Sequence, residues 1–416
     1  MHVKVLHIVS YSTILRVGEE MFKEFLQNNA LKNKELKNLY SLIHKEGPLT
    51  TTDLIEKTSL KKTTLLRMID ELLKRKFIKE CGFRDTAVGR PPILYDVEKE
   101  CSYIIGIHIS RMKTNIVLLN LRFQVVDQKS YVMTTMHTPE FVIMKIQSTI
   151  NYFKEKHDFD EMMLLGIGLS AIGPIEKKKG MILKPESFLA NSWENVPIVQ
   201  MLQEKIPVKV LLEKAANTAA IAEYHSTNFL YEKILFCVSG GWGMDCGIID
   251  GGTILQSDFA DGGYGHMIIN LNGDKCLCGK RGCILAYTSF ESIVNKLGKE
   301  ISLKGKMNED LFQGASLTDM MEFFKQGDEI TEKVIMQSAR YLGVGLSNLV
   351  NLFRPELVII NGPFIFETKN YYEEVVEHTK KNTLNHSNIV FSQGILKENA
   401  AAIGVAILLY NSYFQA

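Results

Sequence analysis

Apolar and polar positions alternate with a helical period in the first hundred residues of the chain. Apolar side chains recur at helical spacing over residues 36–43, and the pattern stops at Gly47-Pro48, which predicts a first helix. Thr50, Thr51 and Asp53 have the capping chemistry that begins a short second helix, which we expect to end near Thr58 and Ser59. An earlier helix is predicted near residues 19–26.

A third helix and a pair of strands complete this pattern. Ser59 can cap the third helix, whose apolar face runs over residues 65–73. Two strand-like runs, 77–78 and 93–95, are separated by an excursion over residues 82–92 that contains glycine and arginine, which predicts a two-stranded wing. This order of elements predicts a winged helix-turn-helix over residues 35–97, preceded by an N-terminal helical extension, residues 1–34.

From Tyr103 onward, short apolar runs alternate with helical patterns, which predicts an α/β fold with helices on a sheet. The predicted strands are 104–109, 115–120, 163–169, 208–212, 234–238 and 357–360.

Composition and charge narrow the class of protein. The chain has 416 residues, of which 46% are hydrophobic and 23% are charged, as in ordinary globular proteins. Net charge is only +1, but residues 31–97 hold fourteen Lys or Arg against nine Asp or Glu, so this segment is the basic one. No apolar run approaches the roughly 18 residues of a membrane span, and no secretory signal is recognisable. We therefore expect a cytoplasmic protein.

The start of the third helix carries side chains suited to DNA. In a helix-turn-helix, the N-terminal side chains of this helix meet base edges in the major groove. The expected contacts of the helix are Lys61, Lys62, Thr63, Thr64 and Arg67. Arg90, in the stiff run from Val88 to Pro92, is the preferred wing contact, with Arg84 second. The alternative is that these basic residues form only a solvated face.

Three of the seven cysteines lie together on one loop that glycines bend. Cys276, Cys278 and Cys283 follow His266, and one nitrogen with three sulfurs makes a closed tetrahedral set for zinc. Because no position stays open for water, we expect Zn²⁺ to be structural. The alternatives are buried free cysteines or a redox pair, and His266 could instead face a ligand.

These motifs resemble the ROK family, which groups bacterial repressors of the xylose and N-acetylglucosamine type with sugar kinases. The resemblance rests on Gly265-His266 with the cysteine loop, on the loop from Gly241 to Gly247, and on the run from Asn348 to Pro355. It covers nearly all of residues 35–416. Members with a helix-turn-helix in front are regulators, so the basic segment favours a regulator.

The resemblance implies an actin-like (ribonuclease H-like) fold of two lobes with a sugar cleft between them. The first lobe would be residues 101–225, completed by a C-terminal helix at 399–416, and the second would be residues 226–398 with the zinc loop.

Family positions that serve phosphoryl transfer carry other residues here. After the first strand, the family's aspartate falls on His108 and its paired glycines fall on Ser110 and Arg111. The Asn-Asp pair that contains the catalytic base falls on Lys214 and Ala215, and alanine cannot accept a proton. Asp245 also stands where the second phosphate loop has glycine. We therefore expect no kinase activity.

Sugar recognition is reduced as well. Two glutamates of the family's hydroxyl-binding set fall on Gly263 and Leu285, which leaves His266, Asn191 and Glu194 as candidate ligand-binding residues. Losing buried polar partners predicts a changed ligand, a weak one or none.

The preferred hypothesis is therefore a repressor of carbohydrate genes that binds a palindromic operator as a homodimer or tetramer and answers to a sugar in the cleft. A second hypothesis is a regulator controlled by a protein partner. A third is an active sugar kinase fused to a DNA-binding module.

Overall fold

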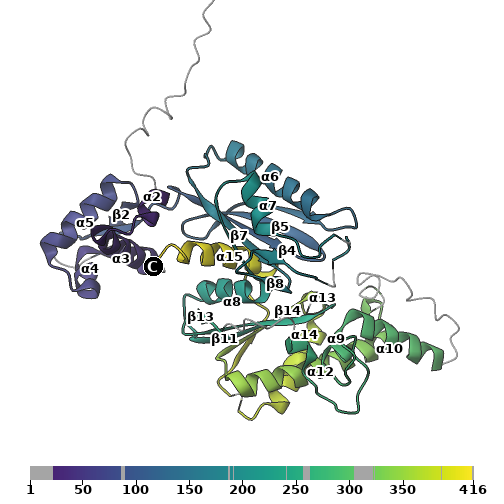
Figure 1. Cartoon of the computed structure of the whole chain (residues 1–416). Helices are drawn as coiled ribbons and strands as arrows, with labels where there is room; N and C mark the ends of the chain where they lie inside the picture. The colour runs from purple at the N-terminus through teal and green to yellow at the C-terminus, as the bar shows by residue number, and fades with distance from the viewer. Residues whose placement is uncertain are drawn as a thin grey trace, which may run out of the picture.

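The computed structural model arranges the chain as an N-terminal unit beside two stacked lobes (Figure 1). It describes residues 22–85, 90–185, 188–190, 192–239, 241–255, 263–303, 322, 324–385 and 387–414. Within these residues, no helix is both long and apolar enough to cross a bilayer.

The N-terminal unit, residues 22–97, has the predicted order of helices and strands. Its helices are α2 (Phe22–Gln27), α3 (Leu31–Glu46), α4 (Thr51–Thr58) and α5 (Lys62–Lys74). Its antiparallel sheet has the order β1 (Leu49–Thr50), β3 (Ile93–Val97), β2 (Ile78–Phe83). Helix α3 begins four residues before the limit that we expected between extension and winged helix. Helix α2 packs on the same core, where the rings of Phe22 and Phe25 contact Tyr40 and Phe77.

Capping explains where α4 begins and corrects one expectation about α5. Thr50 and Asp53 form a capping box in which the Thr50 hydroxyl accepts from the Asp53 amide and the Asp53 carboxylate accepts from the Thr50 amide. We had expected Ser59 to cap α5, but it does not. It adopts a left-handed conformation at the C-terminus of α4, and α5 begins after Lys61 without a side-chain cap. The tight turn between the two helices uses Ser59 to end the first helix instead.

The two lobes are built on five-stranded sheets of the same topology. The first sheet has the order β10 (Lys209–Lys214), β7 (Leu164–Ala171), β4 (Tyr103–Ile109), β5 (Lys113–Asn120), β6 (Val125–Val132). The second has the order β13 (Thr253–Ile254), β12 (Met244–Asp250), β11 (Lys233–Ser239), β14 (Leu357–Asn361), β15 (Val390–Ser392). In each sheet the first three strands along the chain are antiparallel neighbours and the last two join in parallel.

Every predicted strand of the lobes is present within two residues of its expected limits. The prediction missed the partly exposed β6, the glycine-interrupted β12 and the short strands β13 and β15. A small ribbon of β8 (Ile175–Glu176) and β9 (Met181–Ile182) was also missed.

Helices cover the outer face of each sheet. Helices α6 (Pro139–Lys156) and α7 (Ile198–Lys205) pack on the first sheet. The second lobe adds α9 (Leu285–Thr288), α10 (Phe290–Leu303), α12 (Glu329–Phe353), α13 (Pro363–Glu367) and α14 (Lys369–Asn382).

Two alanine-containing helices lie between the lobes, α8 (Ala215–Ser226) and α15 (Ala400–Asn411) (Figure 1). A 3-10 turn, η3 (Lys397–Asn399), precedes α15. Their backbones approach so closely that a Cβ at Gly404 would lie 1.7 Å from the Thr218 carbonyl oxygen. Helix α15 packs as closely on the first sheet, because a Cβ at Gly106 would lie 2.0 Å from the Ala402 carbonyl oxygen. Helix α15 therefore packs tightly on the sheet of the first lobe.

The N-terminal unit docks on the first lobe and on the end of the chain. The Arg122 guanidinium, in the turn between β5 and β6, donates to the Asp96 carboxylate and to the carbonyl oxygens of Ile43 and His44. The His44 ring stacks on Tyr410 of α15, with centroids 4.6 Å apart, and its Nε2 donates to the Leu121 carbonyl oxygen.

A substitution at Gly404 tests the contact between the central helices. Gly404→Ala should lower the free energy of unfolding by several kcal/mol, of the order that overpacking costs, because its methyl group meets backbone and not a movable side chain. Gly298→Ala in α10 is the matched control, since nothing lies within 4 Å of its added Cβ, and it should be neutral or slightly stabilising. Urea denaturation followed by circular dichroism compares the two, and equal stabilities would contradict the close packing.

Candidate functional site

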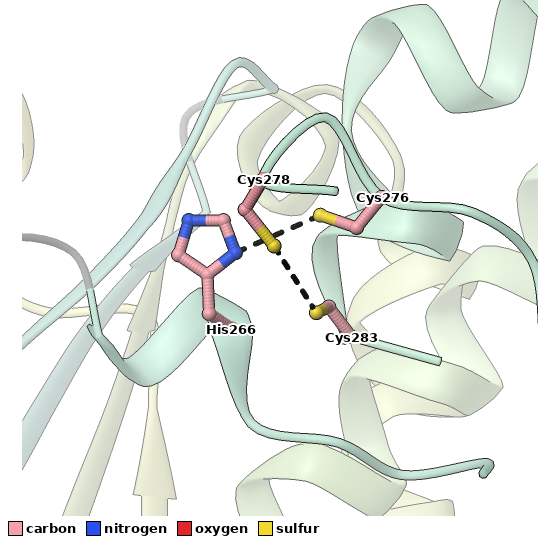
Figure 2. Close-up of side chains that lie close together, drawn as sticks. All are labelled: His266, Cys276, Cys278 and Cys283. Carbon is pink, nitrogen blue, oxygen red and sulfur yellow. Dashed lines mark hydrogen bonds between the residues drawn. The ribbon is translucent and has the colours of Figure 1, made fainter. Parts of the chain in front are cut away.

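The four predicted metal ligands come together in the second lobe (Figure 2). The ligand atoms of His266, Cys276, Cys278 and Cys283 all lie within 4.8 Å of one another. Cys278 Sγ is 3.7 Å from Cys283 Sγ, and Cys276 Sγ is 3.6 Å from His266 Nδ1. A tetrahedral ion with bonds of about 2.3 Å to sulfur and about 2.0 Å to nitrogen needs edges of about 3.5 to 3.8 Å. The cluster can hold a metal ion.

Backbone geometry sets this arrangement. His266 ends the 3-10 turn η1 (Gly263–His266), while the three cysteines lie on the loop that enters α9. Gly282 has a φ of +72°, and a Cβ there would lie 1.6 Å from the Asn270 carbonyl oxygen, so only glycine fits before Cys283. The Ile269 amide donates to the Gly282 carbonyl oxygen and the Ile284 amide to that of Met267. These bonds hold the two halves of the cluster together.

Burial and backbone donors act differently on the thiols. Burial raises the pKa of Cys283 to about 12, whereas the Lys280 amide lowers the pKa of the exposed Cys278. Three thiolates within this distance would repel one another, so a cation is the group that would let them ionise together.

Basic side chains gather at the N-terminal end of α5, on the surface of the N-terminal unit. Lys61, Lys62, Thr63 and Arg67 are exposed, and Thr64 is half-buried. Within the described part of the chain, the three cations among them form no ion pair. The apolar face of α5, which includes Leu65, Ile69 and Leu72, is turned into the core. The helix therefore presents its predicted contact residues to solvent.

The wing gives its two arginines different surroundings. Arg84 forms a bidentate ion pair with Asp53 of α4, with N···O distances of 2.9 and 2.7 Å. Hydrogen bonds from Arg84, followed by those from Thr50, lower the pKa of Asp53 to about 2. Arg90 is exposed, and the wing residues 86–89 lie outside the described residues. Arg84 thus ties the wing to the helix-turn-helix, whereas the exposed Arg90 has no ion-pair partner among the described residues.

The turns that we expected to match the kinase phosphate loops lie where the two lobes meet. Arg111, in the turn between β4 and β5, places its guanidinium 4.2 Å from the ring centroid of Trp242, in the turn between β11 and β12. Ser110 braces its own turn through a 2.7 Å hydrogen bond to the Lys113 carbonyl oxygen. His108 Nδ1 is 3.4 Å from Ser170 Oγ, and burial lowers the pKa of its imidazole to about 4. A cation–π contact therefore joins the two turns.

The predicted position of the catalytic base is at the start of α8. Lys214 ends β10 and Ala215 begins the helix. The nearest buried carboxylate is that of Glu213, which accepts hydrogen bonds from Lys177 Nζ at 2.9 Å and from Asn217 Nδ2 at 3.0 Å. Both oxygens of this carboxylate already have partners.

The structure describes two of the three candidate ligand-binding residues, and their contacts differ. Asn191 lies outside the described residues. Glu194 is exposed and pairs with Lys184 at 3.8 Å, while His266 belongs to the cysteine cluster. Trp193, the residue before Glu194, is buried, and its indole donates to the His137 carbonyl oxygen.

Comparison with known proteins decides the family. A profile described as "ROK family" matches residues 104–412. The chain belongs to the ROK family. A xylose repressor of Caldicellulosiruptor bescii is 27% identical over 86% of this chain and 90% of its own length. The xylose repressor of Bacillus subtilis is also 27% identical, over 92% of this chain and 96% of its own length.

The structural comparisons confirm the predicted fold class. A ROK family transcriptional regulator, described as a homologue of the E. coli MLC protein, superposes with a TM-score of 0.72 at 20% identity, over 91% of this chain and 96% of its own. The ROK hexokinase of Thermus thermophilus superposes with a TM-score of 0.61 at 21% identity, over 76% of this chain and 100% of its own. These likenesses show the fold, which repressors and kinases share.

Sequence reasoning missed two contacts that shape these sites, Arg84 with Asp53 and Arg111 with Trp242. Both join residues from separate elements, and no local spacing signals such a pair. The one local signal of the second pair is Arg111 itself, which stands where the family's first phosphate loop has glycine.

Acid should destabilise the fold through three histidines. Burial lowers the pKa of His44, His108 and His225 to about 4, whereas an unfolded histidine titrates near 6.5. The unfolded chain therefore binds more protons between these values, so the free energy of unfolding should fall from pH 6.5 to pH 4, by up to about 3 kcal/mol per histidine. Urea titrations at several pH values measure the slope. His108→Asn should make it shallower, and an unchanged slope in that variant would contradict a neutral His108.

Proposed function

We propose that the chain is a sequence-specific DNA-binding transcriptional regulator of the repressor type that acts on carbohydrate genes. The observation that carries this proposal is the N-terminal unit, in which α5 presents Lys61, Lys62 and Arg67 to solvent without ion pairs in the described structure. The xylose repressors and the Escherichia coli regulator NagC match this chain through most of their lengths, which supports the same role.

We further propose that the chain is not a kinase. Arg111 and Trp242 bring side chains to the two turns where phosphates would need open backbone. Ala215 has no group that can take a proton from a sugar hydroxyl, and both oxygens of the neighbouring Glu213 are engaged by hydrogen bonds. The same side chains argue against ATP as a ligand.

Partners and location follow from this role. The proposed protein binds a palindromic operator as a homodimer or tetramer, works in the cytoplasm and answers to a sugar in the cleft or to a protein partner. Lys61, Lys62, Thr63, Thr64, Arg67 and Arg90 are the proposed DNA contacts. Arg84 we assign to positioning the wing, because Asp53 already holds its guanidinium.

DNA binding can be tested without knowing the operator. Purified full-length protein should enrich a palindromic motif from fragmented genomic DNA of its own source. On that motif, Arg67→Ala and Arg90→Ala should each weaken binding about tenfold in fluorescence anisotropy at fixed salt, because each loses a base or phosphate contact. Lys369→Ala, on α14 of the second lobe, is the control and should bind like the parent.

Two results would contradict this proposal. One is the absence of any enriched motif, and the other is full affinity in both arginine variants.

Zinc is the metal that we propose for the cluster of His266 and three cysteines. The donor set of one imidazole and three thiols suits Zn²⁺, and the two edge distances fit a tetrahedral ion. Its proposed role is structural, since four protein ligands leave no position for water or substrate. It would clamp η1 to the loop before α9.

Metal analysis tests the zinc proposal. The parent protein should contain about one equivalent of zinc by mass spectrometry of the digested sample, and Cys283→Ser should lose it and unfold at lower temperature. Cys81→Ser is the control, because Cys81 is exposed on β2 far from the cluster. Equal zinc in parent and Cys283→Ser would overturn the assignment.

A further inference from the structure

A cavity of about 650 Å³ lies where the N-terminal unit meets both lobes. Ser41, His44 and Lys45 of α3 form one wall, and Arg122 and Phe123 of the first lobe form another. Gly251 and Gly252, from the turn between β12 and β13 of the second lobe, also line it, and so do the ends of α8 and α15. Its volume falls in the range of small-molecule sites, and it is distinct from the residues assigned to the sugar cleft.

The lining of this cavity is rich in rings. His44 stacks on Tyr410, and Phe123 packs edge-on against Tyr410 and His225 with centroids 5.2 and 5.8 Å apart. Phe229 contacts His225 at 4.8 Å. Rings in such a wall offer flat apolar faces and edges, which favour a ligand with a planar apolar body.

The charge of the lining has one sign. Lys45 and Arg122 line the cavity, while none of the described residues that line it is Asp or Glu. Arg122 already pairs with Asp96. Lys45 forms no ion pair within the described chain, and its ammonium lies 5.6 Å from the Phe229 centroid, beside the ring wall. The site therefore has a cation beside an aromatic surface, with no ion-pair partner among the described residues.

We propose that this cavity binds a small organic anion with a planar apolar ring system, its carboxylate or phosphate facing Lys45. Resting on the proposed regulatory function, we assign it an effector role, because a ligand here touches α3 and both lobes at once. Such a ligand would favour one arrangement of the N-terminal unit on the lobes and so change the affinity for DNA.

Two naphthalene anions serve as probes of the full-length protein, 1-naphthyl phosphate and 1-naphthoate. Isothermal titration calorimetry should show saturable binding of at least one of them, with one site per chain, and the better one identifies the headgroup. Inorganic phosphate and neutral 1-naphthol should each bind at least tenfold more weakly. Phosphate lacks the aromatic ring system, and 1-naphthol lacks the anionic group.

Two variants place the binding in this cavity. Lys45→Gln should weaken the anions at least fivefold while leaving 1-naphthol unchanged, and Ser41→Trp should abolish binding by filling the space. Lys179→Gln, in the turn between β8 and β9, is the matched control and should bind like the parent. Circular dichroism spectra and melting curves like those of the parent establish that the variants fold.

The proposal is overturned if neither anion binds, or if both folded variants bind them as the parent does. DNA binding is measured separately, by anisotropy with and without the probe. The probe should change the DNA affinity of the parent at least threefold and leave Ser41→Trp unaffected, and an unchanged parent affinity would overturn the effector role. DNA binding without probe binding would refute the cavity alone, whereas probe binding without DNA binding would refute the regulatory function alone.

Discussion

The close packing of α8 against α15 is the constraint on which the rest of the molecule depends. Both helices carry small residues where they meet, and the Gly404 backbone reaches the Thr218 carbonyl so closely that no side chain fits between them. The two sheets therefore lie on either side of a thin helical layer. Because α15 also presents Tyr410 to His44, the same layer sets where the N-terminal unit docks. The Glu223 carboxylate at the end of α8 adds to this layer by accepting from the amides of Ile395 and Leu396.

On this scaffold, the turns at the cleft and the basic end of α5 are the two regions that bear on function. The turn after β4 and the turn after β11 are in contact through Arg111 and Trp242. Helix α5 has an exposed basic N-terminal end. A scaffold shared with sugar kinases thus fits, in the proposed function, the positioning of a DNA-reading unit. The cluster of His266 and three cysteines is compatible with both uses, because a metal ion that only clamped η1 to the loop before α9 would not depend on the chemistry of the cleft.

Sequence reasoning found the elements whose signal is local. A few neighbouring residues are enough to indicate the capping box at Thr50 and Asp53 and buried strands such as Leu357–Asn361. The same holds for the spacing of Cys276, Cys278 and Cys283. It failed for Ser59, because a residue that can cap one helix can equally end the one before it. It also could not find Arg122 with Asp96 or Arg111 with Trp242, whose partners are set by the tertiary packing alone.

The place of α15 in the first lobe has a consequence for synthesis of the chain. The sheet of this lobe is complete after Lys214, yet the helix that covers its inner face is translated almost two hundred residues later. Until then, Gly106 and Gly168 of the nascent sheet lack their packing partner, and His44 lacks Tyr410. The N-terminal unit can form its own core early, but it reaches its final position on the lobes only after α15 leaves the ribosome. The contact between His44 and Tyr410 therefore cannot form until α15 has been made.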